Sequence, residues 1–279
     1  MRRADRWLEV ALFFAAGALL WLGFGAPEWR RDVFEPGQRA PLSLRLVTWN
    51  VGGSGSDGLG PLRDDNLAGI GASLRQLAPD VIALQEVASE AQLRELARAA
   101  GTRKATYLLA PGGGRRVAVL ARGGQLRRLP LSVDGPRAMG FEFEGEDGRR
   151  LRGVVLHADA FSAEDRNRLV GEATETLQRA GGDLPSVLLG DLNLDLDLGK
   201  RRDLFTDNEH LDVETYNFVA TRLADGALGT GPTAEPDRRL DYVFVSREEL
   251  VVEHAGVWRG RRLGDMDHDP VVVDVRVTP

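Results

Sequence analysis

Three apolar runs along the chain each end in a carboxylate or an amide: Asn50 after the first, Glu86 after the second, and Asp191 and Asn193 after the third. In an extended chain Asp191 and Asn193 point to the same side. Such side chains at the carboxyl ends of buried strands can converge on one rim of a fold, and the glycine at 190 lets another backbone or a ligand come close. Because carboxylate and amide oxygens suit hard cations, any metal here is expected to be Mg²⁺, Mn²⁺ or Ca²⁺.

Two histidines accompany these acids. His157 ends the apolar run that starts at Val154, and His268 directly follows Asp267 before the last apolar run, while Asp241 begins another. An aspartate beside a histidine fixes the tautomer of the ring and stabilises its charged form. A single histidine after a strand is more often structural, and a single aspartate there is usually a turn residue. The complete set is therefore what indicates catalysis.

The order of these motifs resembles the endonuclease/exonuclease/phosphatase superfamily, which has the deoxyribonuclease I-like fold. The resemblance runs from Leu44 to the end, over more than four-fifths of the chain. It departs at Met266 and Ala121, where the family usually has serine. The motifs are TWN (Thr48–Asn50), QE (Gln85-Glu86), LH (Leu156-His157), GDLN (Gly190–Asn193), LDYVFVS (Leu240–Ser246) and DH (Asp267-His268).

The resemblance implies a divalent-metal-dependent phosphoesterase, most directly a phosphodiesterase or endonuclease acting by in-line attack of water. Mg²⁺ is the expected cation, with Mn²⁺ or Ca²⁺ as alternatives; it would neutralise the clustered acids and polarise the phosphoryl oxygen. The resemblance also implies a role for each site residue. Glu86, Asn50 and Asp267 would contact the metal, Asp191 would align or deprotonate the attacking water, and Asn193 would hydrogen-bond the phosphate. His268, paired with Asp241, would transfer a proton or stabilise charge, and His157 would contact the phosphate or the leaving group.

Several substrates remain open at this stage. A nucleic acid is the first choice and a phospholipid headgroup, as in a sphingomyelinase-like enzyme, the second; a phosphomonoesterase and a non-catalytic tethered binding module are further alternatives. Aromatic residues make up 6% of the chain, and no aromatic-bearing apolar loop follows the amino-terminal segment, which favours a water-soluble phosphodiester. Arg166 or Arg168 could reach a phosphate, although a solvated helix face is the favoured interpretation. Arginine pairs that could line a groove, or simply occupy solvated turns, are Arg115-Arg116, Arg127-Arg128, Arg149-Arg150, Arg201-Arg202, Arg238-Arg239 and Arg261-Arg262.

The elements that must position these residues are short strands with a few helices between them. Capping residues predict helices that open at Ser89 and Ser162, and a third is expected around Asn66–Leu77, closed by Pro79. This pattern predicts an α+β fold, a two-sheet β-sandwich flanked by helices (αββα). The predicted strands are Leu44–Asn50, Val81–Gln85, Ala105–Ala110, Arg116–Ala121, Gly140–Glu144, Leu151–Ala158, Ser186–Gly190, Leu240–Ser246, Val251–Val257 and Val271–Val277.

Composition narrows the chemistry further. The 279 residues carry a formal net charge of −6, which argues against a broad, nonspecific grip on nucleic acid. The absence of cysteine excludes disulfides, thiolate metal ligands and a cysteine nucleophile. With only four histidines, a histidine-rich zinc site is not expected; His210 and His254 match no motif and are interpreted as surface residues.

An uncharged run of 17 residues, Val10–Ala26, follows three arginines near the amino terminus. As a helix it would span about 25 Å, close to the thickness of a bilayer core. We expect a signal anchor, or alternatively a cleaved signal peptide, with the catalytic domain outside the cytoplasm. The expected organisation is an anchor or signal at 1–26, a linker at 27–41 and one catalytic domain at 42–279, with two small domains as the alternative. A monomer is expected.

Overall fold

The computed structural model describes residues 34–37, 39, 41–53, 62–101, 105–180, 182, 184–197 and 211–278. All of them belong to one unit, Val33–Pro279. The apolar run Val10–Ala26, His210 and the Arg201-Arg202 pair lie outside the described residues. Within the described ranges, no helix has the length and apolarity needed to span a membrane.

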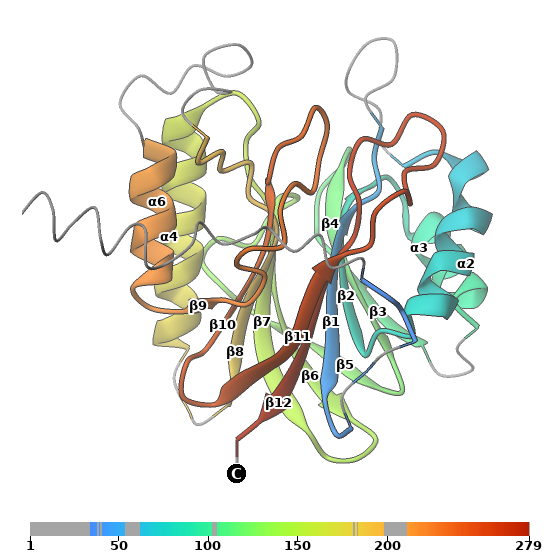
Figure 1. The fold of residues 1–279 in the computed structure, drawn as a ribbon, viewed down its shortest axis with the longest axis horizontal. Helices are drawn as coiled ribbons and strands as arrows, with labels where there is room; N and C mark the ends of the chain where they lie inside the picture. Colours follow the sequence, from blue (N-terminus) through green and yellow to red (C-terminus); the bar gives the residue numbers. More distant parts are fainter. Residues whose placement is uncertain are drawn as a thin grey trace, which may run out of the picture. The chain divides into compact units, whose positions relative to one another are not determined.

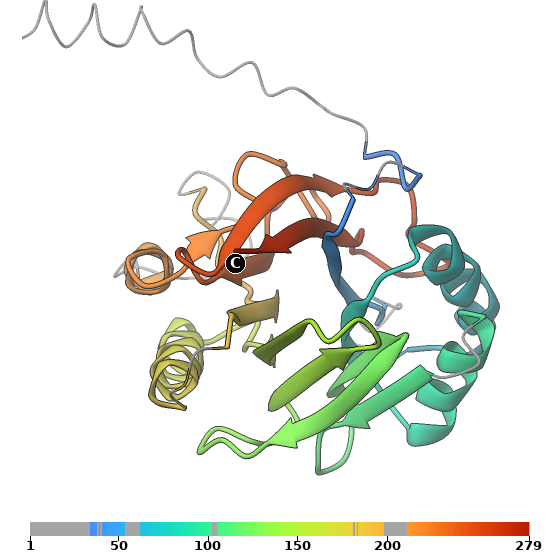
Figure 2. The ribbon, with the colours of Figure 1, turned by 90° about the horizontal axis from the view of Figure 1, so that it is seen from below.

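Two six-stranded sheets pack face to face, with helices on their outer sides (Figures 1 and 2). The strand order is β11-β12-β1-β2-β4-β3 in the first sheet and β5-β6-β7-β8-β10-β9 in the second. The predicted sandwich is therefore confirmed. The strands are β1 Leu44–Asn50, β2 Val81–Val87, β3 Ala105–Leu109, β4 Arg116–Arg122, β5 Gly124–Leu129, β6 Ala138–Gly145, β7 Arg150–His157, β8 Ser186–Asp191, β9 Ala224–Asp225, β10 Asp241–Val245, β11 Leu250–Val257 and β12 Val271–Val277.

Helices α2 (Leu67–Leu77) and α3 (Glu90–Ala99) cover the first sheet, and α4 (Ala163–Arg179) and α6 (Leu211–Ala220) cover the second (Figure 1). Both predicted caps are present. The Ser89 hydroxyl accepts a hydrogen bond from the Gln92 backbone N–H, and the Ser162 hydroxyl accepts one from that of Asp165. A hydroxyl at this position satisfies a backbone donor that the first helical turn leaves without a partner, which is why the helices begin there.

Each sheet contains one pair of parallel strands, and these pairs position the site. Strand β1 runs parallel to β2, and β7 runs parallel to β8. A parallel connection needs a crossover, which α2 supplies in the first sheet and α4 in the second. The carboxyl ends of all four strands therefore lie at the same edge of their sheets, where Asn50 is paired with Gln85 and His157 with Asp191.

The apolar layer between the sheets continues into polar residues at this edge. Leu44 and Leu46 of β1 belong to the inter-sheet core, whereas Val47 and Trp49 pack under α2 and α3. Because side chains alternate along a strand, Asn50 falls on the same inner face as Leu44 and Leu46. In β8 the same alternation puts Asp191 on the face of Val187 and Leu189, and in β10 it puts Asp241 on the face of Val243.

All ten predicted strands are present, and the described residues include two further strands and an α-helix that the sequence pattern did not predict. Strand β5 lies at a sheet edge and is mostly exposed or half-buried, β9 has only two residues, and the sequence of α6, LDVETYNFVA, lacks a clear apolar stripe. Phe34, within the segment expected to be a linker, is buried and lies 5.2 Å from the guanidinium carbon of Arg45.

Gly190 is where the two parallel strands of the second sheet approach each other. A Cβ at this position would lie 2.0 Å from the Leu156 carbonyl oxygen, and the backbone has φ +151°. The expectation that this glycine admits another backbone is thus confirmed. Any side chain would have to push β7 away from β8 immediately before Asp191.

We predict that Gly190→Ala lowers the free energy of unfolding by about 1–3 kcal/mol, because it combines a steric clash with a strained backbone. Urea denaturation would measure this loss. The matched control is Gly171→Ala in α4, where nothing lies within 4 Å of the added Cβ. Alanine there should stabilise the protein by about 0.5–1 kcal/mol. Equal effects of the two substitutions would contradict the packing described.

Candidate active site

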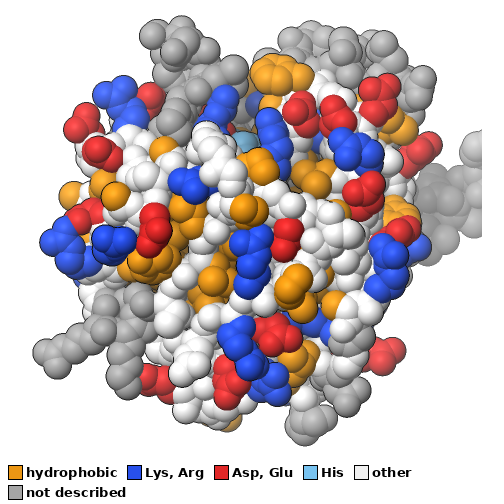
Figure 3. All heavy atoms as spheres, turned by 180° about the vertical axis from the view of Figure 1, so that it is seen from behind, with side chains coloured by type: hydrophobic (Ala, Val, Ile, Leu, Met, Phe, Trp, Pro, Cys, Tyr) orange, Lys and Arg blue, Asp and Glu red, His pale blue; other side chains and the backbone are white. Residues whose placement is uncertain are grey.

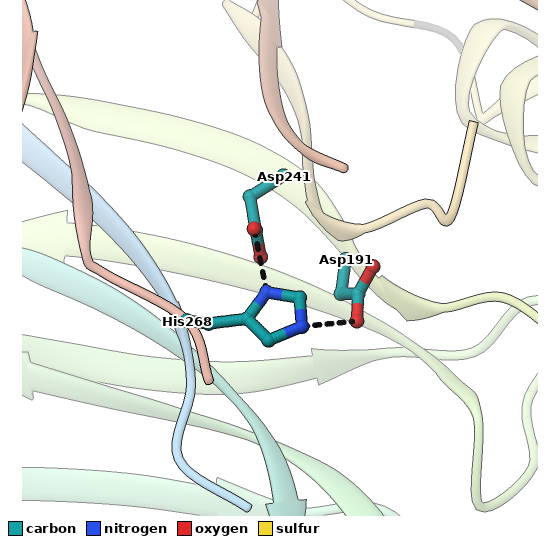
Figure 4. Close-up of side chains that lie close together, drawn as sticks. All are labelled: Asp191, Asp241 and His268. Atoms are coloured by element: carbon teal, nitrogen blue, oxygen red, sulfur yellow. Dashed lines mark hydrogen bonds and ion pairs between the residues drawn. The ribbon is translucent and has the colours of Figure 1, made fainter. Parts of the chain in front are cut away.

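Side chains from both sheets meet at the polar edge of the sandwich. One histidine, His268, lies between two aspartates that come from the opposite sheet (Figure 4). The first sheet and the loop before β12 supply Asn50, Glu86 and His268, and the second supplies His157, Asp191 and Asp241. All of these side chains are buried.

Glu86 reaches the site because β2 is irregular at that point. Its pairing with β4 shifts register between Leu84 and Val87, both of which pack on the outer face. Two residues, Gln85 and Glu86, thus occupy the stretch where regular alternation allows one, and Glu86 has φ +66°. A bulge of this kind redirects a side chain. The Gln85 amide holds the bulge by donating to the Thr48 hydroxyl at 3.2 Å.

Asn50 joins the two buried carboxylates. Its Nδ2 donates to Asp191 Oδ2 at 3.0 Å and to Glu86 Oε1 at 3.4 Å, while its Oδ1 accepts the Gly52 backbone N–H at 3.0 Å. Arg115 approaches from the side, with a guanidinium nitrogen 3.5 Å from Glu86 Oε1. A Cβ at residue 52 would lie 1.9 Å from Glu86 Oε2, so the space beside this carboxylate depends on glycine.

The pair formed by Asp241 and His268 has the shortest contact among these groups. Asp241 Oδ2 lies 2.7 Å from His268 Nδ1, which leaves Nε2 facing Asp191, 3.7 Å from its Oδ2. Asp267 lies on the same side, with Oδ1 3.9 Å from Nε2 of the same ring, and its side chain is 32% exposed. The structure therefore places Asp267 beside His268, and a metal contact for it stays a prediction.

His157 faces the two carboxylates from the end of β7. Its Nε2 lies 3.6 Å from Glu86 Oε1 and 3.7 Å from Asp191 Oδ2. Asn193 is close by, with φ +51°, and its backbone N–H donates to Asp191 Oδ1 at 3.0 Å. The Asn193 amide nitrogen donates to the Ala158 carbonyl at 3.2 Å, so this contact holds it in place next to His157.

Burial and neighbouring charges shift the pKa values of three groups. Burial raises the pKa of Glu86 to about 7, although the charge of Arg115 opposes this rise. Burial also lowers the pKa of His157 to about 4, against the influence of Asp191. For His268, burial alone would lower the pKa, but the charges of Asp241 and Asp191 and the hydrogen bond that Nδ1 donates to Asp241 raise it to about 10. At neutral pH one histidine is therefore neutral and the other charged.

The side of the site around Glu86 fits a hard divalent cation. It presents oxygen donors from two buried acids and an amide, and burial makes the negative charge of Glu86 costly unless a cation compensates it. Glu86 and Asn50, with Asp191 adjacent, would hold the ion beside Gly52. A second group, Asp191, Asp241 and His268, has candidate ligand atoms within 4.8 Å of one another. In that group Nδ1 of His268 already hydrogen-bonds Asp241.

Three further residues lie near the site. Two of them were predicted only as members of arginine pairs that could line a groove, and the third was not predicted. In the pair at 115 and 116, Arg115 faces Glu86 while Arg116 donates to the Ala88 carbonyl. In the pair at 238 and 239, half-buried Arg238 lies within electrostatic range of Asp191 and Asp267. Thr233, which hydrogen-bonds Asp241, belongs to no recognised motif, and no sequence signal identified it.

The structure also tests the interpretations of three other residues, and that of Arg166 was wrong. Arg166 was expected on a solvated helix face, but it is 1% exposed because it forms a buried ion pair with Asp212. Arg168 is exposed and pairs with Asp165. His254, expected at the surface, has a side chain that is 35% exposed, and its ring stacks on Phe34 with the two ring centroids 5.2 Å apart.

Met266 and Ala121, the two departures from the family pattern, are both buried in apolar surroundings. Met266 packs in the layer beneath α2 and α3, and Ala121 lies in the core between the sheets. Both positions thus contribute apolar packing where the family usually has a hydroxyl. Neither substitution removes any of the predicted site residues.

Comparison with known proteins places these features in context. The chain matches the model of the Endonuclease/Exonuclease/phosphatase family over residues 47–262. No curated protein matches it in sequence. Among solved structures, an endonuclease/exonuclease/phosphatase from Beutenbergia cavernae is 25% identical, with a TM-score of 0.59, and the match covers 84% of this chain and 72% of that one.

Two more distant structures share the fold. A mannosyl-6-phosphatase from Bacteroides thetaiotaomicron is 20% identical with a TM-score of 0.62, and the match covers 84% of this chain and 99% of that one. TDP2 from D. rerio, complexed with a single strand DNA product, is 17% identical with a TM-score of 0.61 over 84% of this chain and 99% of that one.

We predict that Glu86→Gln stabilises the metal-free protein at pH 8.5. The pKa of Glu86 rises from 4.5 to about 7 on folding, so the native state disfavours the ionised form and stability is lost as the pH rises through 7. Glutamine removes that loss, and the gain in unfolding free energy should reach ~3 kcal/mol at pH 8.5 and vanish near pH 4. Urea denaturation in chelator would measure it.

The control for this prediction is Glu90→Gln, which changes a largely exposed glutamate at the start of α3. It should leave the difference from the unmodified protein nearly constant across the same pH range. A Glu86→Gln variant that is no more stable than the unmodified protein at pH 8.5 would show that burial of this carboxylate carries no cost.

Proposed function

The chain belongs to the endonuclease/exonuclease/phosphatase family, and on that premise we propose that it is a divalent-metal-dependent phosphodiesterase that hydrolyses its substrate with water. The observation that carries the proposal is the convergence of Glu86, Asn50, Asp191 and the Asp241–His268 pair at one buried edge. This arrangement combines an oxygen-lined cation site with a charged histidine within 4 Å of an aspartate. Phosphoryl transfer to water uses both features, the cation site to stabilise negative charge and the histidine to transfer a proton or stabilise charge.

Each side chain has a role that its position supports. Asp191 accepts hydrogen bonds from Asn50 and from the Asn193 backbone, which orient its carboxylate to align or deprotonate the attacking water. His268, charged and held by Asp241, faces the same space and can stabilise the phosphate or supply a proton. Mg²⁺, when bound at Glu86, would polarise a phosphoryl oxygen and lower the pKa of a coordinated water.

His157 complements His268 because the two rings carry different charges. Its low pKa keeps it neutral at physiological pH, so it can donate one hydrogen bond to a phosphate oxygen or to the leaving oxygen without adding a cation. Arg115 and Arg238 flank the site and supply positive charge near the acids. A guanidinium can bind a phosphate through two parallel hydrogen bonds.

A nucleic acid is the substrate that we propose first. Support comes from the arginines beside the site and from the similar fold of TDP2, whose structure contains a DNA product. One face of the molecule shows positive and negative side chains interspersed, with a histidine visible in a hollow flanked by basic side chains (Figure 3). Binding would therefore depend on local arginines and the metal rather than on a broad basic surface.

We also propose that Val10–Ala26 tethers the enzyme to a membrane with the catalytic domain outside the cytoplasm. The support is in the sequence: an uncharged run of 17 residues preceded by three arginines. Fractionation before and after an alkaline wash would test it. Retention of the full-length protein in the washed membranes is expected, and a full-length protein in the soluble fraction would contradict the tether.

The activity is tested on bis-p-nitrophenyl phosphate, p-nitrophenyl phosphate, plasmid DNA and sphingomyelin, each with Mg²⁺ or with chelator. We expect Mg²⁺-dependent hydrolysis of the diester and of DNA, and a loss of turnover of about 10²–10⁴-fold in Glu86→Ala and in His268→Ala. His254→Gln, a histidine substitution on β11, should retain activity.

Different outcomes separate the alternatives. Hydrolysis of sphingomyelin but not of DNA would indicate a lipid phosphodiesterase, and turnover of p-nitrophenyl phosphate alone would indicate a phosphomonoesterase. No metal-dependent turnover on any substrate would favour a binding module. Activity that survives both alanine substitutions would mean that the chemistry lies elsewhere.

A further inference from the structure

Thr233 lies beside the Asp241–His268 pair, in the loop before β10, and is fully buried. Its hydroxyl lies 2.6 Å from Asp241 Oδ2, the same oxygen that His268 Nδ1 contacts at 2.7 Å. One carboxylate oxygen thus receives both contacts. The other oxygen, Oδ1, is buried and has no hydrogen-bond partner among the described residues.

The direction of the Thr233 hydroxyl proton is fixed by its other contacts. The hydroxyl oxygen accepts the backbone N–H groups of Leu240 at 3.0 Å and Asp241 at 3.1 Å. A hydroxyl has one proton to donate and two lone pairs, and both lone pairs are used here. The proton must therefore point to Asp241 Oδ2, which makes Thr233 a donor to that oxygen with one orientation.

The backbone of Thr233 reaches the histidine side of the pair as well. Its carbonyl accepts the Asp269 backbone N–H at 2.8 Å, and its own N–H donates to the Arg238 carbonyl at 2.8 Å. The next residue, Ala234, forms isolated bridges with both Arg238 and His268. The segment of Thr233 and Ala234 thus contacts Asp241 through the Thr233 side chain and the loop that carries His268 through its backbone.

We propose that Thr233 is a positioning residue for the Asp241–His268 pair, so that Thr233, Asp241 and His268 act as one hydrogen-bonded chain. The hydroxyl holds the carboxylate with Oδ2 toward Nδ1, and this keeps Nε2 directed at the space beside Asp191. The proposal rests on the role in hydrolysis that we propose for His268. It adds a residue that touches neither substrate nor metal and acts only through the orientation of the ring.

The experiment compares Thr233→Val, which removes the hydroxyl at nearly constant volume, with Thr233→Ser, which keeps it. For the valine variant we expect kcat to fall roughly 10–100-fold with KM unchanged, as for other partners that orient a functional histidine. Serine should restore most of the loss. The matched control is Thr174→Val, a buried threonine in α4 whose hydroxyl donates to the Val170 carbonyl; it should leave kcat unchanged.

A second readout does not require activity. In the ¹⁵N-labelled protein, the downfield proton on Nδ1 of His268, assigned by its absence in His268→Asn, reports the hydrogen bond to Asp241. We expect it to shift or broaden in Thr233→Val and to keep its position in Thr233→Ser and Thr174→Val. Should the valine variant not fold, Thr233→Ala removes the same hydroxyl without adding a methyl group in its place.

The two readouts separate the possible failures. An unmodified protein with no hydrolytic activity but with the expected proton shift in Thr233→Val would overturn the proposed function and leave the positioning contact standing. Unchanged kcat and an unchanged Nδ1 proton in Thr233→Val would overturn the positioning role. Equal losses in the valine and serine variants would assign the effect to side-chain packing at this position rather than to the hydroxyl, and would also overturn the positioning role.

Discussion

The burial of like charges at one edge of the sandwich is the constraint on which the site depends. Glu86 and Asp191 lie on either side of the Asn50 amide, largely shielded from solvent. Removing carboxylates from water is costly unless hydrogen bonds or cations compensate them. Around these acids the structure supplies an amide, two histidines and an arginine. In the function that we propose, a divalent cation and a phosphate would meet at the same carboxylates, the cation compensating their negative charge.

Much of this arrangement could be predicted because it follows strand alternation. Asn50, His157 and Asp191 each continue the inner face of an apolar strand, so the type and spacing of residues were enough to indicate that they converge. The helix caps at Ser89 and Ser162 could also be predicted, because the start of a helix depends on the chemistry of nearby residues. The family resemblance then supplied the expected roles of these residues.

What could not be predicted depends on contacts between distant segments or on irregular backbone. Alternation alone would turn Glu86 outward with Leu84; only the bulge and its positive φ bring it inward. Asn193 likewise has a left-handed backbone, which costs about 1–3 kcal/mol for such a residue and is typical of functional sites. The burial of Arg166 could not be predicted because its ion-pair partner, Asp212, lies 46 residues away in the sequence.

The division of the site between the two sheets determines which parts of the core can vary. Asn50 and Glu86 belong to one sheet and His157, Asp191 and Asp241 to the other, so the spacing of reactive groups is set by side chains such as Leu46 and Val243 that separate the sheets. Residues beneath the outer helices set no such spacing. Evolutionary drift in side-chain volume should therefore be tolerated more readily under α2 and α4 than in the layer between the sheets, where it would alter the reaction geometry directly.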